Sequence, residues 1–207
     1  MRIIAIKEPK TPFEQNAIDE MHRLRARIFQ GRLAWNVSCA SDREHDEFDR
    51  LKPTYILALA SNDQVVGCAR LLPTTGTTML GTVFQQLLSR GHLPGHDRMI
   101  ESSRFCVDTD VSAQRGQGAL HLATLAMFAG IVEWSVREGI TEIATATDVR
   151  FERILNRAGW PMSRLGDVVL INETLSVAGV LPANHGTFAR LRPREYQSMF
   201  APLVRVA

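Results

Sequence analysis

The sequence predicts a single α/β domain that spans residues 1–207. Segments that alternate like a strand and segments with the spacing of an amphipathic helix follow one another along most of the chain. One segment of helical length, residues 120–136, is apolar almost all round, which is typical of a central helix packed on a sheet. A chain of 207 residues with 45% hydrophobic residues is also long enough to bury one full core.

The first third of the chain predicts a strand, a helix and a hairpin. Residues 2–6 alternate like a short strand. Residues 11–14 (Thr-Pro-Phe-Glu) supply an N-cap, a proline in the first turn and the glutamate of a capping box, so a helix begins there and runs to about Phe29. Two strand-like runs follow, 55–60 and 65–71, and the polar residues between them predict a turn.

The middle of the chain predicts a helix and then a strand that carries charges. The helix is predicted from six apolar residues at helical spacing, and Gly91 ends it: Met79, Leu80, Val83, Phe84, Leu87 and Leu88. Residues 99–107 predict a strand with Glu101 and Ser103 on one face and Arg104 on the other. Charged side chains in such an apolar segment are costly unless they are paired or used.

The last part of the chain continues the alternation. The long apolar helix is followed by a predicted strand over residues 141–147. Asp148 can cap a further helix, which ends at Gly159. Residues 168–172 predict one more strand, and a short helix is expected over residues 193–200.

Composition argues against several classes of protein. The formal net charge of +2 is too balanced for a nucleic-acid-binding domain. Nearly all basic residues are arginine, which favours bidentate recognition of carboxylate or phosphate, although genome base composition could produce the same bias. Cys39, Cys68 and Cys106 and the six histidines show no spacing typical of a metal site or a disulfide framework, so no metal is expected. No stretch has the length of a membrane span or a signal peptide, which predicts a cytoplasmic protein without a membrane partner.

The most informative cluster lies in residues 21–49. It contains an arginine, two aromatic residues and three carboxylates: Arg25, Phe29, Trp35, Glu44, Asp46 and Asp49. Arg25 and Phe29 are four residues apart and share one face of a helix. Aromatic faces attract onium ions, while carboxylates and an arginine can hold an α-amino group and an α-carboxylate. The cluster therefore predicts a site for a small cation that carries an amino acid. The alternative for this window is an amphipathic helix followed by a solvated acidic loop.

Four segments of the sequence carry a family resemblance. They are LRARIF at 24–29, EHDEFD at 44–49, RLLPTTG at 70–76 and ESSRF at 101–105. In order and approximate spacing, they resemble the signature segments of the acyl-homoserine-lactone synthases, the autoinducer synthases of bacterial quorum sensing. The resemblance covers roughly residues 1–180. Family members often have a proline directly after the Thr-Thr-Gly, whereas this chain has Thr77 and Thr78, which puts the shape of this loop and of the adjoining acyl pocket in doubt.

The resemblance implies a fold and a reaction. The implied fold is a three-layer α/β/α arrangement with a mixed sheet, like that of the Gcn5-related acetyltransferases. The implied enzyme transfers a fatty acyl group, usually from an acyl carrier protein thioester, to the α-amine of S-adenosylmethionine and lactonises the product. It releases methylthioadenosine and the free carrier thiol. S-adenosylmethionine is then a substrate, and no cofactor is expected.

The chemistry of this reaction suggests roles for the charged and aromatic residues. Acylation requires a neutral amine, so a nearby carboxylate can act as general base, and Glu101 is the candidate. Lactonisation is an intramolecular displacement, which mainly needs a folded conformer of the substrate. The residues expected to bind S-adenosylmethionine are Arg25, Phe29, Trp35, Asp46, Phe84 and Arg104. Those expected to form an ion-pair network that shapes the cleft are Asp46, Asp49, Arg70 and Arg104, and a purely structural network is the alternative for each.

Two further surfaces are predicted. The acyl chain needs an apolar tunnel, although most of its candidates are ordinary core by default: Met79, Ser103, Phe105, Leu122, Met127, Thr145, Val149 and Leu155. The family resemblance singles out Thr145 and Thr147 as positions that can sense a 3-substituent. Arg150, Arg153 and Arg157 share one helix face, and we expect them to dock an acidic acyl carrier protein. The alternative is a solvated face partly neutralised by Glu152.

Two competing functions remain open on the sequence. The first is a Gcn5-type acyltransferase that uses acyl-coenzyme A on another amine, because residues 115–119 (Arg-Gly-Gln-Gly-Ala) lie between a strand and a helix, where backbone N–H groups can hold pyrophosphate. That match is imperfect because Ala113 occupies a position where the motif has glutamine or arginine. The second is a non-catalytic sensor, which Glu101 disfavours because a sensor needs no base.

Overall fold

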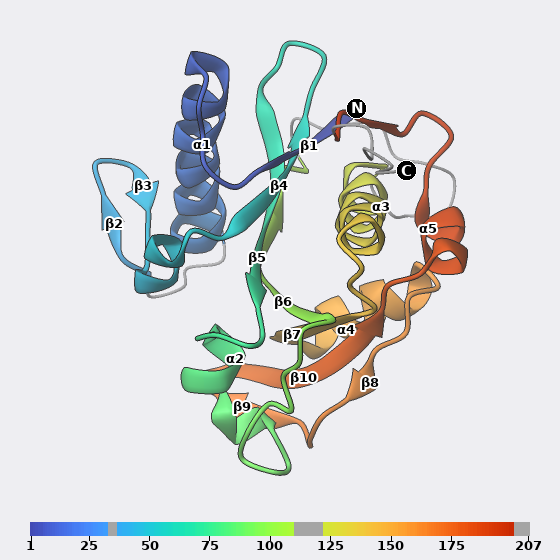
Figure 1. Ribbon diagram of the computed structural model, residues 1–207. Coiled ribbons are helices and arrows are strands. Elements are labelled where there is room, and N and C mark those ends of the chain that lie inside the picture. Colours follow the sequence, from blue (N-terminus) through green and yellow to red (C-terminus); the bar gives the residue numbers. More distant parts are fainter. Residues whose placement is uncertain (33–36, 110–121, 201–207) are drawn as a thin grey trace.

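A mixed β-sheet lies between two layers of helices in the computed structural model, which describes residues 1–32, 37–109 and 122–200 (Figure 1). In these residues the strand order is β11-β1-β4-β5-β6-β7-β10-β8, with β9 beside β10. Pairs β1–β11 and β6–β7 are parallel, and β1–β4, β4–β5, β5–β6 and β7–β10 are antiparallel. The strands are β1 (Arg2–Ile6), β4 (Thr54–Leu59), β5 (Val65–Pro73), β6 (Met99–Val107), β7 (Glu142–Asp148), β8 (Ser163–Arg164), β9 (Val169–Ile171), β10 (Thr174–Pro182) and β11 (Gln197–Ser198).

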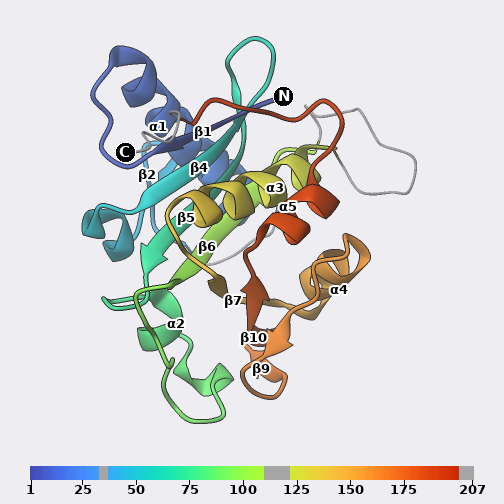
Figure 2. The same cartoon turned by 45° about the vertical axis from the view of Figure 1, so that its right-hand side comes forward.

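The helices cover both faces of the sheet, which confirms the predicted layered α/β fold (Figures 1 and 2). On one face lie α3 (Leu122–Arg137), α4 (Val149–Arg157) and α5 (His185–Leu191). On the other lie α1 (Pro12–Arg25) with a π-helical continuation η1 (Ala26–Arg32), the 3-10 helices η2 (Glu47–Leu51) and η3 (Gln85–Leu87), and α2 (Met79–Thr82). A small hairpin of β2 (Cys39–Ala40) and β3 (Arg43–Glu44) stands beside α1.

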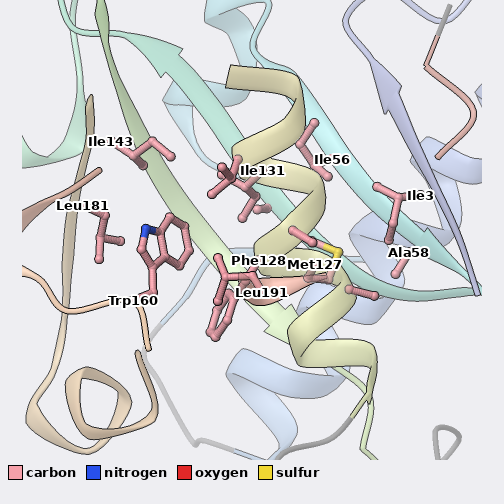
Figure 3. Packing of buried hydrophobic residues seen from close by; sticks show 14 of the residues in the cluster. Ile3, Ile56, Ala58, Met127, Phe128, Ile131, Ile143, Trp160, Leu181 and Leu191 are labelled. Atoms are coloured by element: carbon pink, nitrogen blue, oxygen red, sulfur yellow. The ribbon is translucent and has the colours of Figure 1, made fainter. Parts of the chain in front are cut away.

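The larger apolar core lies on the α3 face (Figure 3). Met127 and Phe128 of α3 share this core with Ile3 of β1 and Ile56 of β4. Gly130 lets α3 approach the sheet closely, because a Cβ there would stand 2.6 Å from Ile3. The apolar helix predicted from the sequence is thus the element that closes this side of the sheet.

Most predicted elements are confirmed. The Thr11 hydroxyl accepts the Glu14 N–H, and the Glu14 carboxylate accepts the Thr11 N–H, as a capping box requires. The hairpin of β4 and β5 and the strands β6, β7 and β9 occur where predicted. Asp148 caps α4 by accepting the Phe151 N–H at 2.7 Å.

The single helix predicted from Met79 towards Gly91 is wrong. The chain forms the short α2, ending at Thr82, and then the 3-10 turn η3. Phe84 separates the two with φ −118° and ψ 28°, which is not helical. The β-branched Thr82 and Val83 favour this break because they lose side-chain freedom in a helix.

The short helix predicted over residues 193–200 is also wrong. The helix of this region is α5, whose cap Asn184 accepts the Thr187 N–H at 2.9 Å. It ends because Arg192, which precedes a proline, is extended. Strands β8 and β10 were not predicted, since β8 has two residues and β10 contains a glycine and a proline.

The predicted alternation of charges along β6 fails at Arg104. Strands β5 and β6 pair Arg70 with Ser103 but Cys68 with Cys106, so two residues of β6 oppose Ala69 alone. Arg104 adopts a left-handed conformation with φ +52°, and this bulge turns its side chain towards Met79, which Glu101 also contacts. The bulge therefore brings Arg104 to the same side as Glu101. Across the described ranges, every helix is too short or too polar to cross a bilayer.

Candidate active site

A buried network of ion pairs lies between α1, η2 and strands β5 and β6. Arg25, at the end of α1, has no exposed surface. Its Nε donates to Glu44 Oε2 at 2.5 Å, and its Nη1 and Nη2 donate to the two oxygens of Asp49 at 2.8 and 3.0 Å. Arg25 was expected beside the substrate carboxylate. The structure directs these three donors to protein carboxylates and so places Arg25 inside the network.

The 3-10 helix η2 fixes the two aspartates of the network. Asp46 Oδ1 accepts the N–H groups of Phe48 and Asp49 at 3.0 and 3.3 Å, and Asp49 Oδ2 accepts the Asp46 N–H at 2.9 Å. This reciprocal capping box holds both carboxylates towards the sheet. The side chains of Asp46 and Asp49 are 11% and 9% exposed and that of Glu44 is fully buried, which excludes a solvated acidic loop for these three carboxylates.

Arg70 on β5 and Arg104 on β6 complete the network. Arg70 Nη1 donates to Asp46 and, at 3.0 Å, to Asp49 Oδ1. Arg104 Nη2 lies 2.8 Å from Asp46 Oδ2, and its Nε donates to Glu44 Oε1 at 3.2 Å. The structure thus brings together the four residues predicted to pair, and Arg25 and Glu44 join them.

The network holds Asp49 in its ionised form. Burial alone would raise the pKa of Asp49, but the hydrogen bonds and charge of Arg25, together with the charge of Arg70, hold this pKa well below its ordinary value. The Tyr55 hydroxyl donates to Asp49 Oδ1 at 2.7 Å, and burial and the Asp49 charge raise the Tyr55 pKa. Asp49 is therefore a fixed negative charge over the whole physiological pH range.

Glu101 on β6 is 1% exposed and lies against the start of α2. Its Oε1 accepts the Met79 N–H at 3.0 Å and its Oε2 accepts the Leu80 N–H at 2.5 Å. Burial raises the pKa of Glu101, and the opposing effects of these two N–H groups and of the Arg70 charge do not cancel that rise. The carboxylate is thus oriented by its backbone partners and more basic than an ordinary glutamate.

The aromatic residues of the predicted pocket have different surroundings. Phe29 is 1% exposed, and its ring centre lies 5.7 Å from the guanidinium carbon of Arg104. Phe84 is half-buried and packs against a small apolar cluster of Phe48, Leu72 and Met79. Trp35 lies outside the described residues.

A cavity of about 890 Å³ opens beside the network. Asp46, Asp49 and Arg104 form part of its wall, and His22, His45 and Tyr55 form another part. Glu101 does not line it within the described residues, and the connection to the cavity runs from Glu101 through Met79 to Arg104.

His22, His45 and Asp49 have ligand atoms within 4.8 Å of one another, a spacing that could hold a metal ion. Arg25 and Arg70 both donate to the Asp49 carboxylate, however, and two guanidiniums beside a dication disfavour its binding. His22 Nδ1 donates to the Glu44 carbonyl oxygen at 2.8 Å, and burial lowers the His22 pKa to about 4, so the ring is neutral at pH 7.

The residues predicted to line the acyl tunnel lie on both faces of the sheet. Met79 packs on the face of the sheet that carries α1 and α2, whereas Met127 and Leu155 are buried in the core of the α3 face. Phe105 packs on the α3 face, with its ring centre 5.2 Å from that of Phe128. The last paired residues of β6 and β7 are Glu101 and Ala144, and beyond them the strands part.

The other residues predicted to line the acyl tunnel lie near the point where β6 and β7 separate. Thr145 Oγ1 donates to the Ser102 carbonyl oxygen at 2.9 Å and so bridges the two strands just past their last pair. Ser103 Oγ accepts from Arg70 Nε at 3.1 Å. Leu122 at the start of α3 and Val149 at the start of α4 are half-buried. A passage from Met79 to the α3 face stays a prediction.

The arginines predicted to dock a carrier protein are exposed on α4. Arg150, Arg153 and Arg157 all face solvent. Glu152, which partly neutralises this face in the alternative interpretation, accepts two hydrogen bonds at 2.7 Å from Arg164 on β8, and the charge of Arg153 also contributes to lowering its pKa. The glycine-containing loop 115–119, on which the coenzyme A alternative depended, lies outside the described residues.

Sequence reasoning missed several partners of the network. Glu44 is in the predicted cluster but not among the predicted ion pairs, and no role in the network is predicted for Tyr55 or Phe48. Charge balance was a usable signal for Glu44, because three arginines inside a fold need more than two aspartates as partners. The Met79 sulfur, which Arg70 Nη2 and Arg104 Nη1 approach to 2.9 and 3.5 Å, had no such signal.

Comparison with known proteins shows which described enzymes this chain resembles in sequence and in fold. The chain matches the family profile described as autoinducer synthase over residues 10–191. It is 56% identical to a probable acyl-homoserine-lactone synthase of Sinorhizobium fredii, with 96% of this chain and 95% of that protein covered. It is 50% identical to an acyl-homoserine-lactone synthase of Agrobacterium fabrum, with 100% and 97% covered. The structure superposes on a coenzyme A-dependent acyl-homoserine lactone synthase, BjaI, solved with S-adenosylmethionine and isopentyl-coenzyme A, with a TM-score of 0.82, 25% identity and 95% and 92% of the two chains covered.

Proposed function

The chain belongs to the autoinducer synthase family and is an acyl-homoserine-lactone synthase, and we propose that it acylates the α-amine of S-adenosylmethionine from a fatty acyl thioester on an acyl carrier protein. The acylated intermediate then closes to an N-acyl-homoserine lactone, a quorum-sensing signal. Methylthioadenosine and the free carrier thiol are the other products.

One observation carries this proposal: the buried Glu101, oriented by the Met79 and Leu80 N–H groups and acted on by the charge of Arg70. The amine nitrogen attacks the thioester carbonyl carbon, so that a C–N bond forms and the C–S bond breaks. The bound ammonium group loses two protons in all: a base takes the first to give the neutral amine that attacks, and the sulfur, which leaves as a thiolate, takes up the second. A carboxylate with a raised pKa is suited to accept the amine proton, directly or through one water, which supports Glu101 as the general base.

The charge of the site suits the amine substrate. The cluster contains four carboxylates, of Glu44, Asp46, Asp49 and Glu101, and the three guanidiniums of Arg25, Arg70 and Arg104. With all of them ionised, one negative charge is in excess. S-adenosylmethionine with its sulfonium, ammonium and carboxylate carries one net positive charge, so its binding neutralises the cluster. The adjoining cavity of about 890 Å³ has the size of a small-molecule site and can receive the adenosyl part.

Lactone formation needs little more from the protein than conformation. The carboxylate oxygen of the acylated intermediate attacks the carbon beside the sulfonium, the C–O bond forms and the C–S bond breaks. The neutral thioether that leaves is a good leaving group, so holding the folded conformer supplies most of the acceleration. The predicted aromatic lining of Phe29, Trp35 and Phe84 can stabilise the sulfonium in that conformer.

The surface of α4 supports an acyl carrier protein as the proposed donor. Its arginines are exposed and the neighbouring carboxylate of Glu152 is engaged by Arg164, which leaves a basic face suited to an acidic carrier protein. The solved relative with isopentyl-coenzyme A makes coenzyme A the other donor to be tested.

The test is a reconstituted reaction. The purified protein is mixed with S-adenosylmethionine and a series of acyl chains on acyl carrier protein or on coenzyme A. Lactone, methylthioadenosine and free thiol are then followed by mass spectrometry and thiol titration. We expect the three products in equal amounts and faster turnover with the carrier protein. No thiol release with S-adenosylmethionine, but release after a different amine is added, would favour an acyltransferase acting on that amine.

A further inference from the structure

Met79 occupies the junction between the proposed base and the arginines of the site. It is the first residue of α2 and is 6% exposed. Its backbone N–H donates to Glu101 Oε1 at 3.0 Å. The side chain of Met79 contacts Arg70 and Arg104. Met79 thus contacts all three of these groups.

The contact with the arginines is made by the thioether sulfur. Arg70 Nη2 lies 2.9 Å from Sδ, and Arg104 Nη1 lies 3.5 Å from it. A thioether sulfur is a weak hydrogen-bond acceptor and cannot donate, so it tolerates two cationic donors without adding a charge of its own. The other N–H groups of the Arg70 and Arg104 guanidiniums donate to carboxylates and to Ser103. The sulfur therefore contacts the Nη groups on the side of the guanidiniums that faces α2.

The geometry assigns to Met79 the role of a positioning residue for the acylation site: its sulfur holds the Arg70 and Arg104 guanidiniums in a fixed place relative to Glu101. This inference rests on the proposed function and differs from a place in the acyl pocket, where Met79 would matter only as an apolar surface. The two roles demand different things of the side chain. Positioning requires an acceptor atom at the end of a chain of this length, whereas acyl contact requires apolar bulk.

Two substitutions separate the roles. Met79→Leu keeps the apolar bulk and removes the acceptor. Met79→Gln keeps the length and supplies an amide oxygen as acceptor but introduces a polar group. Met21→Leu, at a fully buried methionine of α1 packed among apolar residues, is the matched control for losing a thioether from the core.

The two substitutions at Met79 should have different effects on kcat/KM. For Met79→Leu we expect kcat/KM for S-adenosylmethionine to fall about 10-fold, a loss in the range of one hydrogen bond to a charged group. The acid limb of the pH profile of kcat/KM should also move to higher pH, because Arg70 then lowers the Glu101 pKa less. Met79→Gln should retain at least a third of the wild-type value, and none of the variants should change the order of preference among acyl chain lengths. Thermal unfolding of each variant shows that it is folded.

A second measurement needs no substrate. In the free protein, the guanidinium Nη–H signals of Arg70 and Arg104, the groups that contact the sulfur, should be sharp in a nitrogen-15 correlation spectrum for wild type, Met79→Gln and Met21→Leu. They should broaden in Met79→Leu, because the guanidiniums lose a fixed contact. Either of two results would overturn the inference. The first is sharp arginine signals in Met79→Leu. The second is a wild-type kcat/KM in Met79→Leu together with an altered acyl chain preference in Met79→Gln. A wild-type enzyme that forms no lactone from S-adenosylmethionine would refute the proposed function instead, and the arginine signals would still decide whether the sulfur holds them.

Discussion

The two faces of the central sheet are stabilised by different interactions. On the α3 face, Phe128 and Trp160 are buried in a continuous apolar core. On the α1 face, Arg25, Glu44 and Arg70 are buried to the same degree, each with no exposed surface. Apolar packing is nearly indifferent to which side chain fills a given volume, whereas buried charges are stable only when every partner is present. One face of this sheet therefore tolerates substitutions of similar volume and the other does not, and the proposed chemistry lies on the α1 face, which does not.

The largest effect should come from removing a charge on the α1 face. Arg25→Met leaves the carboxylates of Glu44 and Asp49 buried without this partner, and we expect it to lower the free energy of unfolding by about 3–5 kcal/mol. Phe128→Leu on the α3 face is the control, with an expected cost near 1.5 kcal/mol. Urea unfolding measures both. Equal losses would mean that the two faces respond alike and would remove the basis of the comparison.

The second effect concerns activity rather than stability. Glu101→Gln should reduce lactone formation by about 10²-fold or more, because the amide cannot accept the amine proton. The fold should survive, since the amide oxygen can still accept one of the two backbone N–H groups. Turnover close to that of wild type would exclude Glu101 as the base.

The third effect is a dependence of the free energy of unfolding on pH. The Asp49 pKa is lower in the folded than in the unfolded chain, so its carboxylate stabilises the fold above the unfolded value of about 3.9 and this contribution is lost as the pH falls towards the folded value. Asp49→Asn should therefore cost about 2 kcal/mol at pH 7 and progressively less below pH ~4. The measurement is urea unfolding of both proteins from pH 7 to pH 3. A difference that stays constant over this range would show that the Asp49 charge does not contribute.

The smallest effect is expected at the surface of α4. Arg153→Glu should lower kcat/KM for the acyl carrier protein substrate by a few-fold to about 10-fold, and the wild-type value should fall as salt screens the attraction. The same chains on coenzyme A should react almost as before. If neither salt nor the substitution changes the rate, the carrier protein docks elsewhere.

The elements that could be predicted from the sequence are those whose signals are local. The capping box of α1, the apolar helix α3 and the cap of α4 each depend on residues within a few positions of one another. The capping box of η2 is equally local, with Asp46 and Asp49 three residues apart, but the sequence analysis assigns the two aspartates to ion pairs and, for Asp46, to substrate binding, and does not predict the cap.

The features that could not be predicted depend on contacts across the sheet. Regular alternation placed Arg104 on the wrong face because nothing in the sequence marks the bulge opposite Ala69. The contact of the Met79 sulfur with two arginines follows from that bulge and from the break after α2, so it required the structure. The predicted network contained Asp46, Asp49, Arg70 and Arg104, while the membership of Arg25 and Glu44 and the pairing of all six came from the geometry.

The left-handed backbone at Arg104 bears on the stability of the fold. A residue with a Cβ pays roughly 1–2 kcal/mol for this conformation, and glycine does not. Replacement by glycine would relieve the backbone but delete the guanidinium that meets Glu44, Asp46 and Met79. Leaving the buried carboxylates without this partner costs about 3–5 kcal/mol, more than the backbone relief, so glycine at position 104 would destabilise the fold. The ion pairs of the Arg104 side chain thus offset the strain of its own backbone, and the same residue that is unfavourable locally is favourable for the fold as a whole.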